Sequence, residues 1–464
     1  MKKCTVSDHI ENIVVVLILG IMFISFISMI WNGLILSLQK HDYIAKEDLN
    51  GQKNIVDWAQ LYPAKEENDV YYSIDLDNDV FFEDLANNWV EPEFKDIEDI
   101  HDEILGEKLV KIEDSYFSAM NQLKKKVNES KSYIPKYSNM AEFAGRVNLT
   151  CGKSYFDEHN DIYLLPNGQL TGVEERYTIE SIKYQLCNII NFEYWLDSKG
   201  IDFAYIQYPY KEAAFNEMLP EGAYDYADHN ADTILKYLQW KEINNLDLRD
   251  EVVNDKLDYS SLFFKTDHHW NLYGGKYAAT KIGEYLKSDF GYDMDTDFLS
   301  DDKFYEEKHE KHSLGSYGRK VTLAEVVPDD FDLLIPNYET SFEIENKDIG
   351  ENIIGTFSDV MIDRKRFEEE DYYNNICYDA LLYGNRPLTR ITNLYNDNGP
   401  KILIIRDSFS LAMAPYLALM AKEVDLIDVR SNLGDFSGSI KTFIDDTSPD
   451  IVIIMTDIGQ YKFF

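Results

Sequence analysis

The alternation of strand-type and helix-type segments from about residue 146 onward constrains the fold of this chain most. Residues 203–208 and 401–405 are short apolar stretches of strand type, whereas helical periodicity extends from Thr178 to about Ser198 and from about Leu272 to Leu286. Strands that alternate with helices form a sheet with both faces covered, and such sheets are mostly parallel. The sequence therefore predicts an α/β fold with a central, mostly parallel sheet.

Further elements are expected on the same grounds. Asn167-Gly168 after an apolar stretch predicts a β-hairpin. Additional strands are expected at Leu246–Val252, Val424–Val429 and Ile451–Met455. Residues 289–398 lose the alternation and are acidic and turn-rich, with short β-like pieces. We predict that they form an inserted irregular or β region, or a lid.

Length and charge limit the organisation and the partners. A chain of 464 residues is too long for one compact core, so we expect two folded units or one large domain with an insertion. The 84 acidic and 45 basic side chains give a net charge of −39, which disfavours nucleic acid as a partner. The acidity is typical of a protein that stays soluble at the cell exterior.

The N-terminal region has the pattern of a membrane anchor. Residues 12–39 carry no charged side chain and are mostly Ile, Val, Leu, Phe and Met, and a bilayer requires about 20 apolar residues. Lys2 and Lys3 precede this stretch, and positive charge stays on the cytoplasmic side. We therefore expect a cytoplasmic tail at 1–11, a transmembrane anchor at 12–39 and an extracytoplasmic remainder. The alternative is a cleaved signal peptide, but its apolar core is usually about 7–15 residues long.

Two regions follow the expected anchor. Residues 40–145 are predicted to form an acidic juxtamembrane stretch and an amphipathic brace helix, whose apolar residues recur at helical spacing between 97 and 127. A coiled-coil or partner-binding role for that helix is the alternative. Residues 146–464 are predicted to be the functional domain.

The four cysteines do not form a recognised metal or redox motif. They lie at Cys4, Cys151, Cys187 and Cys377, without a C-x-x-C pair. One Cys151–Cys187 bridge and reduced buried thiols are both compatible with this spacing.

One candidate catalytic segment follows the apolar strand 401–405. Ser408 would lie between the carboxyl end of this strand and a helix that begins near Ser410. Unpaired backbone N–H groups at such a position can stabilise an oxyanion. The alternative is that Asp407 or Ser408 only caps the helix, as these residue types prefer to do.

The other candidate segment is Thr266-Asp267-His268-His269-Trp270-Asn271. Together with Ser408 it supplies the carboxylate, imidazole and hydroxyl of a Ser-His-Asp acyl-transfer site. Asp267 or Asn271 could instead cap the following helix. A metal site formed by Asp267, His268 and His269 is a third interpretation, but adjacent residues seldom point the same way and no second ligand pattern accompanies them.

These segments resemble the DHHW family, which is related to the alginate O-acetyltransferase components of the SGNH-hydrolase-like proteins. The resemblance rests on 266–271 followed by Gly274-Gly275 and on the later Asp407-Ser408-Phe409-Ser410. Supporting pieces occur at 315–319, 383–385 and 428–430. It covers roughly residues 150–464.

The resemblance implies an SGNH-like three-layer α/β/α fold. It also implies that Ser408 attacks an acetyl ester, that His269 is the general base and that Asp267 orients it. By analogy Gly384 and Asn385 would complete the oxyanion hole, with Tyr383 and Arg406 as further substrate-binding candidates; no metal or cofactor is implied.

Three functions are compatible with this pattern. The first is a membrane-anchored O-acetyltransferase acting on an exopolysaccharide or cell-wall glycan, with a membrane-bound O-acyltransferase supplying the acetyl group. The second is a carbohydrate acetyl-esterase with the same three residues. The third is a non-catalytic scaffold of a glycan-export assembly.

Overall fold

The computed structural model describes residues 162–220, 223, 225–323, 325–346, 351–428 and 436–456, all within one compact unit. The expected anchor at 12–39 and the expected brace helix at 97–127 lie outside these residues, as do Cys4 and Cys151. Within the described ranges, no helix combines the length and the apolar character that crossing a bilayer requires.

An eight-stranded sheet forms the centre of the described structure, in the order β4-β3-β12-β10-β11-β9-β7-β8. Neighbouring strands from β4 to β11 are parallel, whereas β9, β7 and β8 pair antiparallel. The expectation of a mostly parallel sheet is therefore corrected to a mixed sheet. The strands of this sheet are β3 (Asp202–Gln207), β4 (Asn245–Asp247), β7 (Phe342–Asn346), β8 (Glu351–Gly355), β9 (Leu388–Asn393), β10 (Lys401–Arg406), β11 (Glu423–Asp428) and β12 (Ile451–Met455).

The antiparallel half of the sheet comes from within residues 289–398. This region was predicted to be an inserted irregular or β region, or a lid, and its strands β7, β8 and β9 extend the central sheet. Phe342 and Ile344 alternate with less buried residues along β7, which is the pattern of a strand with one face on the core. Two short two-stranded antiparallel sheets lie outside the main sheet: β1 (Tyr163–Leu164) with β2 (Leu170–Thr171), and β5 (Phe304–Glu307) with β6 (Leu333–Pro336).

The expected strand Leu246–Val252 is mostly helix. Strand β4 ends at Asp247, whose side chain accepts a hydrogen bond from the backbone N–H of Arg249 and caps α9. Leu248 and Val252 are buried on one face of this helix, four residues apart. The apolar spacing is therefore helical, and Asp247 marks the change.

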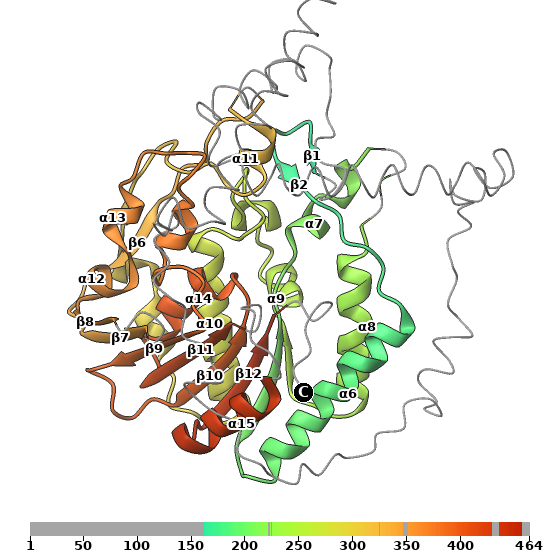
Figure 1. Ribbon diagram of the computed structural model, residues 1–464, viewed down its shortest axis with the longest axis vertical. Helices are drawn as coiled ribbons and strands as arrows, with labels where there is room; N and C mark the ends of the chain where they lie inside the picture. The colour runs from blue at the N-terminus through green and yellow to red at the C-terminus, as the bar shows by residue number, and fades with distance from the viewer. Residues whose placement is uncertain are drawn as a thin grey trace, which may run out of the picture. The chain divides into compact units, whose positions relative to one another are not determined.

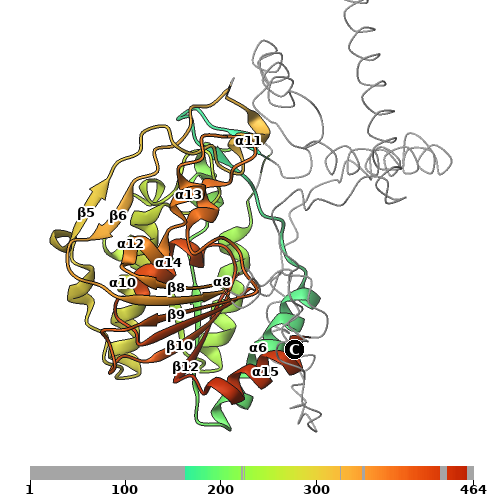
Figure 2. The same ribbon diagram turned by 60° about the vertical axis from the view of Figure 1, so that its left-hand side comes forward.

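Helices cover both faces of the sheet, as the expected three-layer fold requires. Figure 2 shows α10 and α14 on one side of the strands and α6 and α15 on the other, and Figure 1 shows the order of the strands between them. The helices are α6 (Ile179–Asp197), α7 (Lys211–Ala214), α8 (Ala227–Trp240), α9 (Leu248–Asn254), α10 (Leu272–Asp289), α11 (Gly318–Val321), α12 (Phe357–Met361), α13 (Arg364–Phe367), α14 (Ser410–Leu417) and α15 (Phe436–Thr447).

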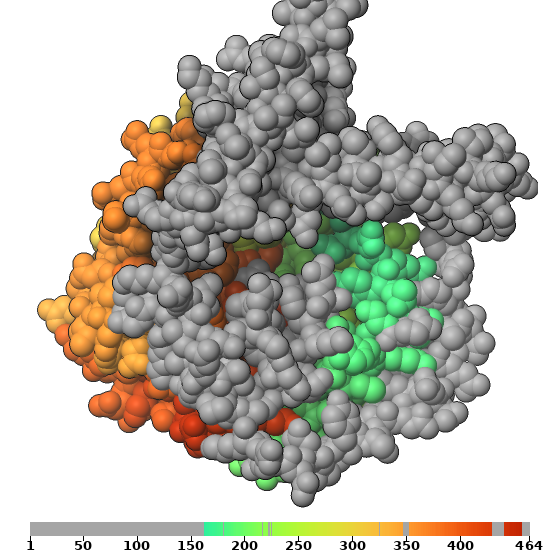
Figure 3. Space-filling model, viewed as in Figure 1, coloured from blue at the N-terminus to red at the C-terminus, as the bar shows by residue number. Residues whose placement is uncertain are grey.

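Helix α6 confirms the amphipathic pattern predicted for 178–198. Thr178 caps it by accepting a hydrogen bond from the N–H of Ser181. Ile182 and Leu186 are fully buried, whereas Tyr184 and Tyr194 are exposed. The side chains of this helix are visible at the surface of the space-filling view (Figure 3, green).

The close packing of α10 against α14 fixes the two candidate catalytic segments relative to each other. A Cβ atom at Gly275 on α10 would overlap the carbonyl oxygen of Ala412 on α14. Only glycine allows the two helix backbones to approach this closely. Because α10 follows His269 and α14 follows Ser408 in the chain, their contact brings these two residues to one edge of the sheet.

Candidate active site

Ser408, His269 and Asp267 form one continuous chain of hydrogen bonds. His269 Nε2 lies 2.6 Å from Ser408 Oγ, and His269 Nδ1 lies 2.6 Å from Asp267 Oδ1. The three residues are buried, with 5–7% of their surface exposed. This is the order of hydroxyl, imidazole and carboxylate in which an imidazole can take a proton from a serine while a carboxylate holds its other nitrogen.

The strand β10 presents Ser408. Residues 402–405 of this strand are Ile, Leu, Ile and Ile and are buried, and the chain leaves the strand after Arg406 and enters α14 at Ser410. Asp407 Oδ1 accepts a hydrogen bond from Phe409 N at 2.9 Å, which tightens this turn. Tyr208 Oη donates to Asp407 Oδ2 at 2.6 Å. Both carboxylate oxygens of Asp407 therefore hold the turn between β10 and α14 in place.

Asp267 is held by a second segment of the chain. The N–H of Ser316 donates to Asp267 Oδ2 at 2.7 Å, and the N–H of His269 donates to Asp267 Oδ1 at 3.0 Å. Gly315 lies directly against this residue, because a Cβ atom there would be 2.5 Å from Asp267 Cα. Both carboxylate oxygens are thus fixed before any substrate binds.

The surroundings of Asp267 keep its carboxyl ionised. Burial alone would raise its pKa, but the charge of His269, the hydrogen bonds from His269 and the charge of His268 hold the pKa well below its ordinary range. A permanently ionised Asp267 favours the Nδ1–H tautomer of His269, which leaves Nε2 to accept the proton of Ser408.

Aromatic side chains fix the plane of the His269 ring. The ring stacks on that of Tyr378, with centroids 4.0 Å apart and an interplanar angle of 6°. Trp270 Nε1 donates to the carbonyl of Phe409 at 2.8 Å, which ties the residue after the base to the residue after the serine. The Phe409 ring in turn stacks on Tyr208, 4.3 Å away.

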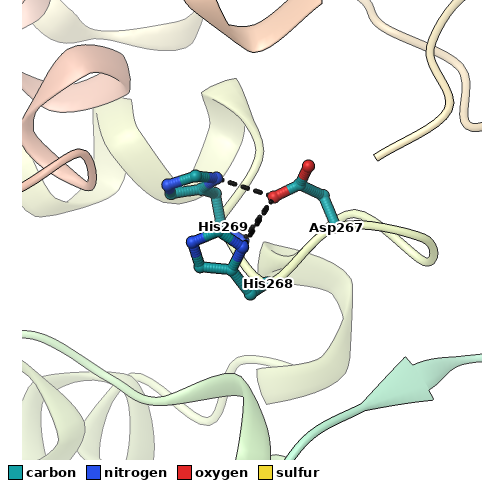
Figure 4. A group of neighbouring side chains, drawn as sticks. All are labelled: Asp267, His268 and His269. Atoms are coloured by element: carbon teal, nitrogen blue, oxygen red, sulfur yellow. Dashed lines mark hydrogen bonds and ion pairs between the residues drawn. The ribbon is translucent and has the colours of Figure 1, made fainter. Parts of the chain in front are cut away.

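The two neighbouring histidines have different surroundings. His268 Nδ1 lies 2.7 Å from Ser316 Oγ and 3.3 Å from Asp267 Oδ1, and about a third of its side chain is exposed. Figure 4 shows both imidazoles directed at the same oxygen of Asp267. His269 in addition lies within hydrogen-bonding distance of Ser408.

The same three residues are those of the metal interpretation. Potential ligand atoms of Asp267, His268 and His269 lie within 4.8 Å of one another. Among the residues that the structure describes, this is the one group of at least three potential ligands that lie so close together. However, His269 Nδ1 and His268 Nδ1 face Asp267 Oδ1 and Ser316 Oγ at hydrogen-bonding distance. Both Nδ1 atoms thus have hydrogen-bonding partners, and the arrangement of His269 is that of a base whose ring is held in place by a carboxylate.

The further substrate-binding candidates lie in one neighbourhood. Arg406 is fully buried, and its guanidinium donates to Asn385 Oδ1 at 2.6 Å and to Asp428 Oδ2 at 3.2 Å. Its guanidinium thus links Asn385 to Asp428 inside the protein. Tyr383 and Gly384 have φ angles of 64° and 85°, and a left-handed backbone at a non-glycine residue is strained.

Two charged residues that support the site were not found by the sequence reasoning. Lys211 donates to three backbone carbonyls of residues 264–267, and Asp329 accepts from the N–H groups of Lys265 and Thr266. For Lys211 a signal did exist, since it follows the buried strand β3 by four residues and lies on the sheet edge that carries Ser408. Asp329 lies in a turn-rich stretch, and no local pattern distinguishes it from the acidic residues nearby.

Part of the chain matches a known protein family. Residues 174–331 match the family described as "SGNH hydrolase-like domain, acetyltransferase AlgX". This part of the chain is therefore similar to the SGNH-hydrolase-like domain of AlgX-type acetyltransferases. The match agrees with the resemblance inferred from the motifs and with the expectation of an O-acetyltransferase-type enzyme. No curated protein matches the chain by sequence.

Several solved structures are similar to this chain. Bacillus cereus PatB1 with a sulfonyl adduct aligns with a TM-score of 0.55 at 18% identity, over 66% of this chain and 100% of PatB1. A DHHW family protein from Eubacterium siraeum aligns with a TM-score of 0.44 at 18% identity, over 64% and 90% of the two chains. The O-acetyltransferase domain of Pseudomonas putida AlgJ aligns with a TM-score of 0.38 at 13% identity, over 65% and 93%. The likeness to PatB1 establishes the α/β fold and carries no residue roles.

Proposed function

We propose that this chain transfers acetyl groups through Ser408 to hydroxyls of an exopolysaccharide or cell-wall glycan. The observation that carries the proposal is the hydrogen-bonded chain from Ser408 Oγ through the His269 ring to Asp267. The match of residues 174–331 to a family described by an acetyltransferase supports the choice of acetyl as the acyl group.

In the first half-reaction, Ser408 becomes acetylated. His269 Nε2 takes the proton of the Ser408 hydroxyl while Oγ attacks the carbonyl carbon of an acetyl ester. The tetrahedral intermediate collapses, the bond to the donor oxygen breaks, and His269 returns the proton to that leaving oxygen. Positioned general-base help of this kind typically contributes about 10²–10⁴-fold in rate.

The oxyanion of the intermediate needs hydrogen-bond donors. Ser408 lies just before the first turn of α14, where backbone N–H groups have no partner within the helix. We assign the Ser408 N–H as the first donor, and Asn385 and Gly384 stay proposed as the others. An oxyanion donor is worth about 10²–10³-fold in kcat.

In the second half-reaction, a glycan hydroxyl takes the acetyl group. His269 removes the proton of that hydroxyl, the new ester forms, and the proton returns to Ser408 Oγ as the acyl-enzyme bond breaks. If water enters instead, the same site is an esterase. The choice between transfer and hydrolysis depends on how well the acceptor excludes water from the acyl-enzyme.

The location of the domain determines where the acetyl group comes from. We propose that residues 12–39 anchor the chain and that the described domain is extracytoplasmic, on the basis of the uncharged apolar stretch and the lysines before it. A membrane-bound O-acyltransferase would then deliver acetyl groups from the cytoplasm. Reporter fusions at the two ends of the chain test this topology, and a cytoplasmic C-terminal reporter would contradict it.

Hydrolysis of a chromogenic acetyl ester by the full chain tests the catalytic assignment. Wild-type protein should release acetate. Ser408→Ala and His269→Ala should each lower kcat by about 10²–10⁴-fold. Ser410→Ala is a matched control, since it removes a nearby buried hydroxyl that does not contact His269. Equal rates for wild type and Ser408→Ala would refute the proposed function.

Mass spectrometry of oligosaccharide products separates the alternatives. An acetylated oligosaccharide, formed in preference to free acetate, identifies a transferase, whereas free acetate alone identifies an esterase. A scaffold would produce neither, and its Ser408 would not become acetylated when the ester is added.

A further inference from the structure

Lys211 is a fully buried lysine with an unusual set of partners. Its ammonium group donates to the backbone carbonyls of Phe264 at 2.7 Å, Lys265 at 3.0 Å and Asp267 at 2.8 Å. An ammonium group has three hydrogens, so these contacts use its full donor capacity. All three acceptors belong to the short segment that leads into His269.

Asp329 holds the same segment through its N–H groups. Its carboxylate accepts from Lys265 N at 2.6 Å, Thr266 N at 2.8 Å and Thr266 Oγ1 at 2.5 Å. The backbone of 264–267 is not part of a helix or the main sheet, so its polar groups need other partners. Lys211 and Asp329 supply five of them, and backbone groups of Leu170, Gly318 and His269 bond the rest of those that are paired.

The residue after Lys211 supports the other segment that touches Asp267. Glu212 is buried and accepts a hydrogen bond from Tyr317 Oη at 2.8 Å. Tyr317 follows Ser316, whose N–H donates to Asp267 Oδ2. The start of α7 is therefore bonded both to the segment that carries Asp267 and to the segment that fixes its carboxylate.

We infer that Lys211 is a positioning residue of the acyl-transfer site, which sets the placement and the charge environment of the Asp267–His269 pair without touching substrate. The inference rests on the proposed function of Ser408, His269 and Asp267. Lys211 acts through the carbonyl of Asp267, two residues before the base. Displacing a reacting group by about 1 Å can cost 10²-fold in rate, so a loss of this contact should be visible in kcat.

The charge of Lys211 also acts on the pair. Burial lowers the pKa of Lys211 to about 8. The carboxylates of Asp329, Asp267 and Glu212 face the ammonium and raise its pKa, but by less than burial lowers it. A nearby cation disfavours the protonated form of an imidazole. Removing Lys211 should therefore move the acid limb of the kcat/KM profile for ester hydrolysis to higher pH. The other charged groups that face the pair, His268, Arg319 and Asp379, stay unchanged.

Two substitutions separate hydrogen bonding from charge. Lys211→Met removes both, and Lys211→Gln keeps amide donors without the charge. We expect Lys211→Met to lower kcat for ester hydrolysis by about 10²-fold with KM changed less than about threefold. Lys211→Gln should recover part of kcat, and both variants should show the shifted acid limb.

A matched control is available on α10. Lys276 is also buried, with one carboxylate partner, Asp301, at 2.6 Å. Lys276→Met should keep the kcat and the pH profile of the wild type. An equal loss in Lys276→Met and Lys211→Met, or a loss in Lys211→Met without a shifted limb, would overturn the inference in favour of a general structural role.

Two further measurements keep the outcomes distinct. If Lys211→Met does not fold, the turnover assay is replaced by the rate at which a sulfonyl fluoride labels Ser408 in Lys211→Gln. Labelling slower than in the wild type supports the inference. A rate equal to that of the wild type contradicts it. Ser408→Ala in the same assay tests the proposed function separately. Loss of activity in Ser408→Ala with wild-type kinetics in both Lys211 variants would refute the role of Lys211 and leave the function intact.

Discussion

Gly275 on α10 lies so close to Ala412 on α14 that a Cβ atom at Gly275 would be 2.6 Å from the Ala412 carbonyl carbon. These helices begin directly after the two candidate catalytic segments, since α10 starts three residues after His269 and α14 two residues after Ser408. The spacing between the helix backbones therefore sets the spacing between the imidazole and the hydroxyl.

Gly275→Ala should separate these helices and lower both stability and activity. Overpacking a tight contact typically costs about 1–3 kcal/mol, and here the obstacle is backbone that cannot rotate away. Gly283→Ala on the same helix is the control, because its Cβ would meet the flexible end of the Met420 side chain. Denaturant unfolding and ester turnover measure the two effects, and similar values for the two variants would contradict the proposed role of the contact.

Periodic apolar patterns made the main elements of the fold predictable. Helix α6, the strands β3, β10, β11 and β12, and helix α10 lie where apolar spacing placed them, since local spacing determines which face of each element is buried. Asp247 shows the limit of this reasoning: it ends a strand and caps a helix within a stretch, 246–252, in which apolar and charged residues are mixed. The antiparallel strands within 289–398 were not assigned to the central sheet, because which strands pair depends on contacts between distant residues.

The candidate site was predictable to a different extent. Asp267, His269 and Ser408 were named from motifs, whereas their mutual distances depend on packing that the motifs do not encode, above all the contact of Gly275 with Ala412. Lys211 and Asp329 were missed because each acts on backbone groups far along the chain. A residue that binds main-chain atoms leaves no side-chain pattern near its partners.

The two adjacent histidines should differ sharply in their effect on turnover. His269→Ala removes the group that contacts Ser408, and kcat should fall by about 10²–10⁴-fold. His268→Ala removes a partly exposed ring that contacts Ser316, and kcat should fall by less than about tenfold. Steady-state ester hydrolysis by the two variants tests this order, and a larger loss in His268→Ala would reverse the assignment of the base.

Tyr208→Phe should loosen the turn that presents Ser408. The phenol donates to Asp407 Oδ2 at 2.6 Å, and hydrogen bonds to charged groups contribute about 1.5–3 kcal/mol. The stacking of this ring on Phe409 would persist, so the loss reports the hydroxyl alone.

Tyr205→Phe is the control for that measurement. Tyr205 is equally buried on β3, but its hydroxyl donates to the neutral Gln207 Oε1 at 3.0 Å. We expect Tyr208→Phe to lower both the free energy of unfolding and kcat, and Tyr205→Phe to lower only the first. An unchanged kcat in Tyr208→Phe would show that the Asp407 turn holds Ser408 without the phenol.

Asp267→Asn should abolish most activity while it preserves the fold. The amide has the shape of the carboxylate, but it favours the wrong tautomer of His269, a change that costs about 10⁴-fold in kcat in a serine protease triad. Ser316 N would still find an oxygen on the amide. A crystal structure with unchanged positions of Ser408 and His269, together with the lost turnover, would establish the electrostatic role. Near-normal turnover in this variant would show that Asp267 does not orient the base.

Asp267 should also contribute stability that depends on pH. Although burial opposes it, the charge and hydrogen bonds of His269 hold the pKa of Asp267 well below its ordinary range. A carboxyl whose pKa is lower in the folded state stabilises the fold above its unfolded pKa, about 3.9, and loses this contribution as the pH falls toward the folded value. The difference in unfolding free energy between wild type and Asp267→Asn should therefore stay constant from about pH 7 to 5 and shrink below about pH 4. Asp293→Asn, at an exposed position, should differ little from wild type throughout. A difference that grows on acidification would mean that Asp267 is protonated in the folded protein, and an ionised orienting carboxylate would then be untenable.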